Sequence, residues 1–450
     1  MPAPSNNNDP VTEITAKHTF GTWRYQKGWK PLHIVDAEGC YFFDADGKRY
    51  LDFSSQLMCS NLGHKNKAVI EAICEQARKL PYISPIFTCD ARAELSKLLL
   101  NVFPKGLEKF FFSTSGTEAV EAAIKISRLY TGKYKIISRY RSYHGSTGAS
   151  MAATGEVRRI PSEPAGKVDG IIFAPDMDMY RSPFGVDFQD RVIASAQYVD
   201  YMIRNEGNVA AILVEPVVGT NGVLVPPKEY LPMLREIADK RGVLLIIDEV
   251  MSGWGRTGEW FAINHWNVAP DILTTAKGIT GAYAPLGVTA TTREIAEHFE
   301  DHYFAHGHTY EAHPLTLAPA IAAIKEYERL DLIRAAKKRG EYLGGRLKDL
   351  MKIHPSVGDV RGLGLFWAVE LVKNRKTKEP FYNAEDKLAG RPSLLAMISA
   401  DLLKRGVYVN DWLSHFIIAP PLIITEEEID EGVNALDQSL KIAEEKVEAS

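Results

Sequence analysis

Residues 209–248 read VAAILVEPVVGTNGVLVPPKEYLPMLREIADKRGVLLIID, and this stretch decides the fold class. Two short runs rich in Val, Ile and Leu, at 209–216 and 243–248, enclose the helical pattern KEYLPMLREIADKRG at 228–242. Short apolar runs are typical of strands that are buried on both faces, and a strand, helix, strand order is typical of a parallel sheet. The stretch therefore predicts one βαβ unit.

The same alternation continues on both sides of this unit. KFFF (109–112) predicts a strand, TEAVEAAIKISRLYTG (117–132) a helix and KYKIIS (133–138) the next strand. DILTTAKG (271–278) predicts a further short strand downstream. From about 70 to 330 we therefore expect an α/β arrangement with a mainly parallel sheet.

The two ends of the chain have a different pattern. Residues 39–53, GCYFFDADGKRYLDF, contain a polar turn between alternating apolar residues, which indicates an antiparallel hairpin. Long helical patterns flank GLGLFWAVELV in the last quarter of the chain. We expect 1–70 to be an N-terminal segment of a small domain, 71–334 to be a large domain, and 335–450 to complete the small domain.

Composition excludes several classes of function. Of 450 residues, 45% are apolar and 24% charged, with a formal net charge of −4, which is typical of a globular protein and not of a nucleic-acid-binding surface. Cys40, Cys59, Cys74 and Cys89 show no CxxC spacing, so we expect buried free thiols. The first ten residues are polar, and apolar runs such as GVLLII are too short to span a bilayer. We expect a soluble, cytoplasmic protein without membrane or nucleic-acid partners.

Charged residues stand at three predicted strand ends. Glu215 ends ILVE, Asp248 ends LLIID and Lys277 ends ILTTAK. Ligands bind beyond the carboxyl ends of the strands of a parallel sheet. Lys277 lies in a stretch of small and apolar residues, where burial would penalise its charge. A structural ion pair would explain an acid beside a lysine equally well.

Other residues favour a cofactor site over a structural ion pair. Ser115, Gly116 and Thr117 lie between a predicted strand and a predicted helix, where free N–H groups and the helix dipole can hold a phosphate. A simple helix cap is the alternative. Tyr143 follows the next strand and could stack on a flat ring or belong to the core. A phosphate site, an aromatic platform, an acid and a lysine are what pyridoxal 5'-phosphate (PLP) needs.

The chain resembles the class III (ω-type) PLP-dependent aminotransferases of fold type I, from about residue 20 to 440. Eight motifs in order carry the resemblance: DGKRYLDF, STSGTEA, YRSYHG, LVEPVVGTNGVLVPP, LLIIDEVMSGWGRTG, PDILTTAKGITGAYAPLG, GHTYEAHPLTLA and VRGLGLFWAVEL. The resemblance implies PLP as the cofactor of the large domain. It also implies a smaller α+β domain that is built from both ends of the chain.

The resemblance implies a role for each matching residue. Lys277 and Asp248 are the implied catalytic residues: Lys277 forms the internal aldimine with PLP, and Asp248 pairs with the pyridine nitrogen. Tyr143 and Val250 enclose the ring, and Thr309 reaches the phosphate of the partner subunit. The full set of implied cofactor-binding residues is Ser115, Gly116, Thr117, Tyr143, His144, Glu215, Asp248, Val250, Lys277 and Thr309. A homodimer is thus the implied minimum active unit, and a tetramer stays open.

The implied reaction is ping-pong transamination, in which Lys277 transfers the proton. The stretch 28–57 resembles the branch of taurine, β-alanine and amine:pyruvate enzymes, so an ω-amine or amino acid is the expected donor and pyruvate the expected acceptor. In many ω-transaminases an arginine before the PPL motif binds the carboxylate of the keto acid. Here Asn410 or Asp411 stands at that position. A PLP-dependent isomerase, an epimerase or aminomutase, is therefore the alternative.

The substrate is less defined than the cofactor. Four residues are candidates for the substrate pocket, each with a packing role as the alternative: Trp23, Met58, Trp412 and His415. The sequence does not identify the donor amine, decide between pyruvate and 2-oxoglutarate, or give the enantiomer preference.

Two motifs suggest other chemistry and are set aside. GWGRTG (253–258) matches the dinucleotide-binding pattern, but it begins five residues after the aspartate of the strand and does not open a good helix. The histidines in HYFAHGHTYEAH (302–313) lack the helical spacing of a metal site, so we expect no metal.

Overall fold

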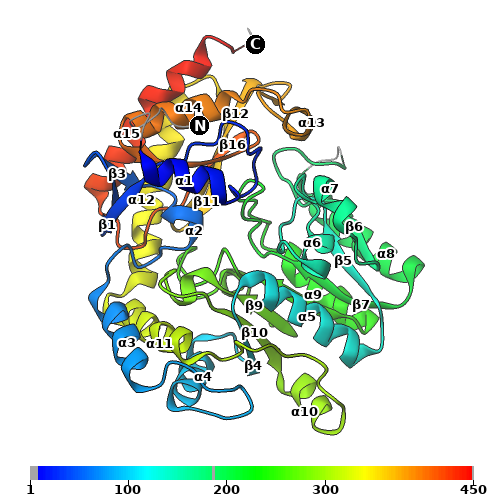
Figure 1. Ribbon diagram of the computed structural model, residues 1–450. Coiled ribbons are helices and arrows are strands. Elements are labelled where there is room, and N and C mark those ends of the chain that lie inside the picture. Colours follow the sequence, from blue (N-terminus) through cyan, green and yellow to red (C-terminus); the bar gives the residue numbers. More distant parts are fainter. Residues whose placement is uncertain (1–8, 185–187, 448–450) are drawn as a thin grey trace.

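A seven-stranded sheet forms the centre of the computed structural model, which describes residues 9–184 and 188–447 (Figure 1). The strand order is β4-β10-β9-β8-β7-β5-β6. The strands from β9 to β6 run parallel, whereas β10 is antiparallel to β4 and β9. The strand bounds are β4 (Leu107–Ser113), β5 (Lys135–Arg139), β6 (Ile171–Ala174), β7 (Val209–Val214), β8 (Leu244–Asp248), β9 (Ile272–Thr275) and β10 (Gly287–Thr292). The predicted α/β class with a mainly parallel sheet is confirmed.

Apolar clusters cover both faces of this sheet, because alternate side chains of a strand point to opposite sides. Ile246 of β8 packs in one cluster with Val120 and Ile124 of helix α5. Its neighbours Leu245 and Ile247 belong to the other cluster, together with side chains of α8 and α9. The helices next to the sheet are α5 (Gly116–Thr131), α6 (Gly148–Ala153), α8 (Phe188–Glu206), α9 (Tyr230–Arg241) and α10 (Arg293–Asp301). Polar chemistry is thereby restricted to the ends of the strands.

Helices α5 and α9 end where the sequence predicts. The Oγ of Ser115 accepts the N–H of Glu118 at 3.2 Å and caps the start of α5. Gly132 and Gly242 follow the two helices with φ of +64° and +59°. Only glycine adopts this left-handed conformation at little cost, so both residues terminate their helices.

A second region joins the two ends of the chain. The predicted hairpin is confirmed, since β2 and β3 pair antiparallel. β3 also pairs in parallel with β14 near the C-terminus, so one sheet has the order β1-β2-β3-β14. A neighbouring sheet has the order β11-β12-β16-β15, and β13 pairs with β12. The bounds are β1 (Ile34–Glu38), β2 (Tyr41–Asp44), β3 (Arg49–Asp52), β11 (Val357–Leu363), β12 (Phe366–Asn374), β13 (Glu379–Pro380), β14 (Val407–Tyr408), β15 (Asn410–Trp412) and β16 (His415–Ile418).

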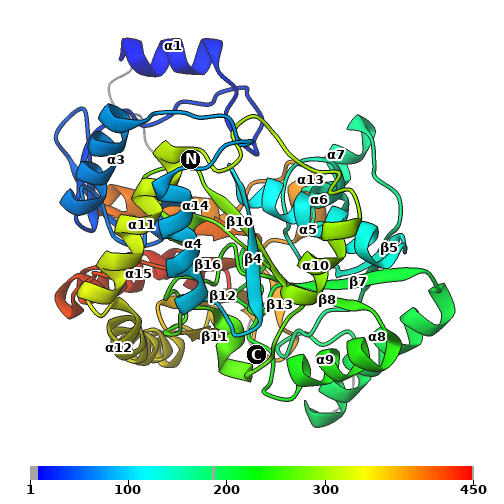
Figure 2. The ribbon, with the colours of Figure 1, turned by 90° about the horizontal axis from the view of Figure 1, so that it is seen from below.

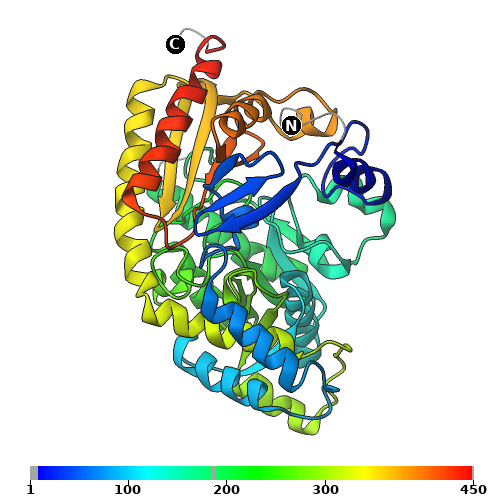
Figure 3. The ribbon, with the colours of Figure 1, turned by 60° about the vertical axis from the view of Figure 1, so that its left-hand side comes forward.

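Helices from distant parts of the sequence also pack against one another. Figure 2 shows α3, α4 and α11 next to each other, and Figure 3 shows α12 (yellow) beside α15 (red). The remaining helical bounds are α1 (Pro10–His18), α2 (Ser55–Met58), α3 (Lys67–Lys79), α4 (Asp90–Val102), α7 (Arg159–Ser162), η1 (Glu163–Ala165), η2 (Ala262–Trp266), η3 (Lys277–Ile279), α11 (Pro314–Arg329), α12 (Leu332–Ile353), α13 (Ala384–Leu388), α14 (Leu394–Lys404) and α15 (Glu426–Glu444). The domain boundaries near 70 and 334 stay predictions, and residues 1–8 and 448–450 lie outside the described residues.

The expectation that all four cysteines are buried is wrong. All four cysteines are free, but only Cys40 is buried, whereas Cys59, Cys74 and Cys89 are partly exposed. Cys74 lies in α3, a helix that buries Val69 and leaves most of its surface exposed or partly exposed, and CxxC spacing carries no information on burial. Within the described part of the chain, none of the helices combines the length and the apolar character needed to cross a membrane.

Glu249, directly after β8, is a buried acid with no cation among its hydrogen-bond partners. Its carboxylate accepts hydrogen bonds from the Ser252 hydroxyl at 2.5 Å and from the Ile263 N–H at 2.7 Å. Burial raises the pKa of Glu249 to about 7, although both hydrogen bonds oppose this shift. The folded protein therefore holds a proton on Glu249 at pH values where the unfolded chain has released it.

We expect this carboxyl group to make stability fall as the pH rises. Because its folded pKa is raised, the stabilisation is complete below about pH 4.5 and is lost as the pH passes about 7. Glu249→Gln should remove a pH-dependent contribution of about 3 kcal/mol and flatten the unfolding midpoint measured from pH 5 to 8. Glu236→Gln, on the exposed face of α9, is the matched control. An unchanged slope in Glu249→Gln would contradict this origin.

Candidate active site

A cavity of about 200 Å³ lies at the carboxyl ends of β7, β8 and β9. It is lined by Ser115, Gly116, Thr117, Tyr143, His144, Gly145, Glu215, Thr220, Asp248, Val250, Met251, Ala276 and Lys277. This lining brings together all the predicted cofactor residues except Thr309. The strand-end rule accounts for this, since Asp248 ends β8, Glu215 follows β7 and Lys277 comes just after β9.

The amine of Lys277 has a lowered affinity for a proton. The residue opens η3 with a φ of +51°, a left-handed conformation that is costly outside glycine and that clusters at active sites. Burial lowers the pKa of Lys277, while the negative charges of Asp248 and Glu215 act in the opposite direction. A desolvated, neutral lysine is a nucleophile and a base.

Asp248 is an anchored anion in the same cavity. The Nδ1–H of His144 donates to its Oδ2 at 2.7 Å, and the Val250 N–H donates to its Oδ1 at 3.0 Å. A carboxylate can accept about four hydrogen bonds, so capacity remains on the side that faces the cavity. His144 is buried, and its Nε2 has no hydrogen-bond partner. The pair therefore offers a fixed negative charge to a positively charged ring nitrogen.

Glu215 holds the aromatic wall of the cavity. Its Oε1 accepts the Tyr143 N–H at 3.1 Å, and its Oε2 accepts the Gly219 N–H at 2.8 Å. Burial raises the pKa of Glu215. The carboxyl group thus ties the loop after β5 to the turn after β7.

The start of α5 forms the other end of the cavity. The Ser115 side chain caps the helix, which was the alternative to a phosphate-binding role, and the N–H groups of Gly116 and Thr117 lie in the first turn. A Cβ on Gly116 would come within 2.7 Å of the Val250 Cγ1, so only glycine leaves this wall open. The first turn of a 16-residue helix offers N–H groups and a positive dipole end to an anion.

These residues fit PLP. The cavity has a lysine amine, an anchored carboxylate with unused acceptor capacity, an aromatic wall at Tyr143 and an anion site at a helix start. These four features match the aldehyde, the ring nitrogen, the ring face and the phosphate of the cofactor.

Trp23, Met58 and Thr309 do not line the cavity. Trp23 packs edge-on against Tyr143 with ring centroids 6.3 Å apart, and Met58 is buried. Thr309 is exposed and does not line the cavity of its own chain; its carbonyl accepts the Tyr82 hydroxyl at 3.1 Å.

Trp412 and His415 lie behind the cavity wall. Trp412 donates its Nε1–H to the Asn221 Oδ1 at 3.3 Å. His415 donates its Nε2–H to the carbonyl of Thr220, a lining residue, at 2.9 Å. Burial and the charge of Arg361 together lower the pKa of His415 to about 3. His415 therefore acts on the cavity through Thr220 and stays neutral.

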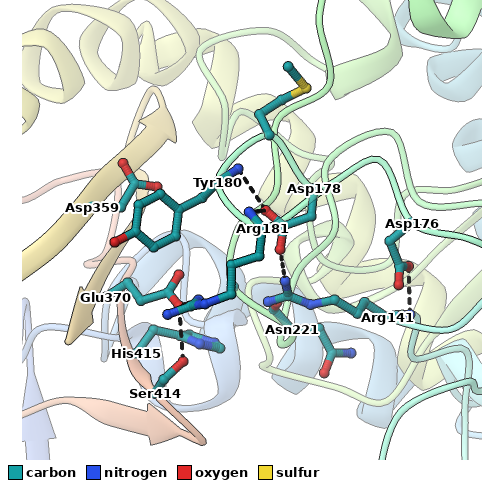
Figure 4. A network of polar contacts seen from close by, with 12 residues as sticks. Arg141, Asp176, Asp178, Tyr180, Arg181, Asn221, Asp359, Glu370, Ser414 and His415 are labelled. Atoms are coloured by element: carbon teal, nitrogen blue, oxygen red, sulfur yellow. Dashed lines mark hydrogen bonds and ion pairs between the residues drawn. The ribbon is translucent and has the colours of Figure 1, made fainter. Parts of the chain in front are cut away.

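A network of arginines and acids supports this wall from behind (Figure 4). Arg141 pairs with Asp178 and donates to the Asn221 carbonyl at 2.5 Å. Arg181 pairs with Glu370 of β12. The loop that contains Thr220 and Asn221 is thus held between the central sheet and the C-terminal sheet.

Sequence reasoning missed Arg158, which lies beside the aromatic residues of the site. Its guanidinium carbon is 4.0 Å from the ring centroid of Tyr143, 4.4 Å from that of Trp412 and 5.3 Å from that of Trp23. One of two adjacent arginines at the start of a short helix carries no pattern that would single it out. The packing of distant segments places it beside Trp23 and Trp412.

The two motifs that were set aside have other roles. Arg256 of GWGRTG is fully buried and donates to the carbonyls of Leu365 and Pro420 and to the side chains of Ser55 and Asn61, at 2.5 to 3.1 Å. It joins the central region to both chain ends. In the part of the chain that the structure describes, no group of three His, Cys, Asp or Glu side chains could hold a metal ion.

Comparisons with known proteins agree with this geometry. The family model described as aminotransferase class III matches residues 24–440. A taurine–pyruvate aminotransferase of Bilophila wadsworthia is 36% identical over 97% of this chain and 98% of the relative. A leucine/methionine racemase of Thermococcus litoralis is 35% identical over 93% of this chain and 92% of the relative.

A solved structure has the same fold over nearly its whole length. The taurine:2-oxoglutarate aminotransferase of Bifidobacterium kashiwanohense, in complex with PLP and glutamate, has a TM-score of 0.92 and 37% identity, and the match covers 97% of this chain and 98% of that chain. Both the cavity and the matched families therefore point the same way: the chain belongs to the class III aminotransferases, which use PLP as their cofactor.

Proposed function

We propose that this enzyme transfers the amino group of an ω-amine or amino acid to a keto acid, with pyruvate as the first acceptor to test. One observation carries the proposal: Lys277 and Asp248 face one cavity from neighbouring strand ends, and burial lowers the pKa of the lysine. The taurine–pyruvate relative supports a small amine donor of the taurine or β-alanine type.

Each residue of the cavity has a separate role in the proposed reaction. PLP, when bound, supplies a carbonyl carbon that condenses with primary amines and a ring that accepts the electron pair of a broken C–H bond. Lys277 takes the proton from the substrate carbon with its neutral amine and returns it to the cofactor side. Asp248 holds a negative charge beside the ring nitrogen, fixed by His144 and the Val250 N–H. Glu215 keeps the wall at Tyr143 in position.

The anion site and the oligomer belong to the same proposal. The N–H groups of Gly116 and Thr117 and the Ser115 loop would hold the phosphate. The loop of Thr309 is exposed and does not line its own cavity, which supports a contact with the phosphate in a second copy of the chain. A homodimer is therefore the proposed active unit, with a tetramer left open, and we propose the cytoplasm as its location.

A PLP-dependent isomerase is the second candidate function. The racemase relative favours it, and so does the absence of an arginine at positions 410 and 411, because an isomerase needs no acceptor. Both reactions use the same lysine, so the fold does not distinguish them. The fate of the amino group distinguishes the two reactions.

Absorbance spectra of the purified holoenzyme with single amines distinguish the two reactions. Taurine, β-alanine, 1-phenylethylamine, putrescine and L-alanine are added one at a time without an acceptor. Loss of the yellow band is expected with at least one donor, and pyruvate should restore it. Lys277→Ala should lower the rate of this loss by about 10²-fold to 10⁴-fold, while the exposed control Lys228→Ala leaves it unchanged. A band that no amine removes, together with exchange of the α-proton of an amino acid for solvent deuterium, would favour the isomerase.

Asp248→Asn tests the anchored charge. The amide keeps the shape and loses the negative charge, so we expect the rate of the amine half-reaction to fall by about 10²-fold or more. Stopped-flow absorbance measures this rate. Asp239→Asn, on the exposed face of α9, is the control. A variant as fast as the unaltered enzyme would exclude Asp248 from the role assigned above.

A further inference from the structure

Many ω-transaminases have a carboxylate-binding arginine before the PPL motif. In this chain Asn410 and Asp411 stand there, and both already make hydrogen bonds within the protein. Asn410 donates from Nδ2 to the Gln56 carbonyl at 2.5 Å, and its Oδ1 accepts the Tyr408 hydroxyl at 3.0 Å. Asp411 accepts the Ser399 hydroxyl at 2.9 Å and repels anions. A substrate carboxylate must therefore find its cation elsewhere.

Arg158 is placed to supply that cation. Its side chain is 11% exposed and lies against Tyr143, which lines the cavity, and against Trp412 and Trp23. Aromatic faces attract a guanidinium, so the three rings restrict the position of this group. The group is thus positioned before any substrate arrives.

The hydrogen bonds of Arg158 are incomplete. Its Nε pairs with the Oε1 of Glu156, whereas Nη2 is buried and has no hydrogen-bond partner. A buried donor without an acceptor is costly and uncommon. A ligand oxygen at Nη2 would remove this cost.

A second cation lies beside Arg158. Lys387 lies on Trp412 with its Nζ 4.3 Å from the ring centroid, so two cations contact the same indole. Two acids face these cations: Glu156 pairs with Arg158, and the charges of Asp411 and Glu156 both act on Lys387. The charge of Arg158 also reaches Lys277, whose pKa is lowered first by burial and then further by this arginine. Tyr143 lines the cavity together with Lys277 and contacts Arg158, so the cation lies next to a wall of the same cavity.

We infer that Arg158 binds the acidic group of the substrate, a carboxylate or sulfonate that is separated by a short chain from the carbon that exchanges the amino group. This inference rests on the proposed function and specifies its substrates: short keto acids, and donors of the taurine or β-alanine type. Tyr143, Trp23 and Trp412 form aromatic walls around the anion. Amines without an acidic group do not use Arg158.

Binding of unreactive anions to the holoenzyme tests the inference without turnover. Propionate and ethanesulfonate resemble pyruvate and taurine but carry no group that reacts, and calorimetry gives their dissociation constants. Arg158→Gln should weaken both by about 10-fold to 100-fold, the range for hydrogen bonds to a charged group. Arg158→Lys should recover part of the affinity, because it keeps the charge and loses the planar fork. The neighbour Arg159 pairs with Glu163 and stacks on Phe173, so Arg159→Gln is the matched control and should bind both anions normally.

Half-reactions separate substrate recognition from a general loss of structure. In Arg158→Gln we expect the KM of pyruvate and of taurine to rise about 10-fold to 100-fold, while 1-phenylethylamine and putrescine react within about twofold of the unaltered rate. Equal anion binding by Arg158→Gln and the unaltered enzyme would overturn the inference. So would an equal loss of rate with all donors, or an unaltered enzyme that binds neither anion. Failure of every amine to remove the yellow band overturns the proposed function instead, and the anion titrations report on Arg158 independently of that outcome.

Discussion

The central sheet is buried on both faces, and this constraint determines where chemistry can occur. Strands such as β8 alternate Leu245, Ile246 and Ile247 between two apolar clusters, so a charged side chain within them would lose its hydration without compensation. The first positions open to polar groups are the carboxyl ends of the strands. There Asp248 and Lys277 are deep enough to be desolvated and still border a cavity. The sheet thus creates the environment that lowers the pKa of the lysine.

The parts of the structure that depend on short stretches of sequence could be predicted. Apolar runs with a helix between them define the βαβ unit, and the turn DADGKR defines the hairpin of β2 and β3. Because parallel strands end at one edge, the placement of Glu215, Asp248 and Lys277 in one cavity also follows from strand order alone. The cap at Ser115 is equally local, since donor and acceptor are three residues apart.

Features that depend on distant segments could not be predicted. Arg158 contacts Tyr143 and Glu156 nearby in the sequence, but also Trp23 and Trp412, which are more than a hundred residues away on either side. His415 was a candidate for the pocket, yet it contacts the carbonyl of Thr220 and lies among arginines, because the C-terminal sheet packs behind the cavity wall. Neither contact leaves a periodic or spacing signal in the sequence.

The pairing of β3 with β14 has a consequence for the synthesis of the chain. The Leu51 N–H donates to the Gly406 carbonyl at 2.8 Å, and the Phe53 N–H donates to the Tyr408 carbonyl at 3.0 Å. A ribosome makes the hairpin early and its partner strand only after some 350 further residues. During that interval the edge of β3 has free backbone groups, which are a template for pairing with other chains. The nascent enzyme therefore passes through a period in which the edge of β3 is open to pairing with other chains. This period ends only when β14 has been made and pairs with β3.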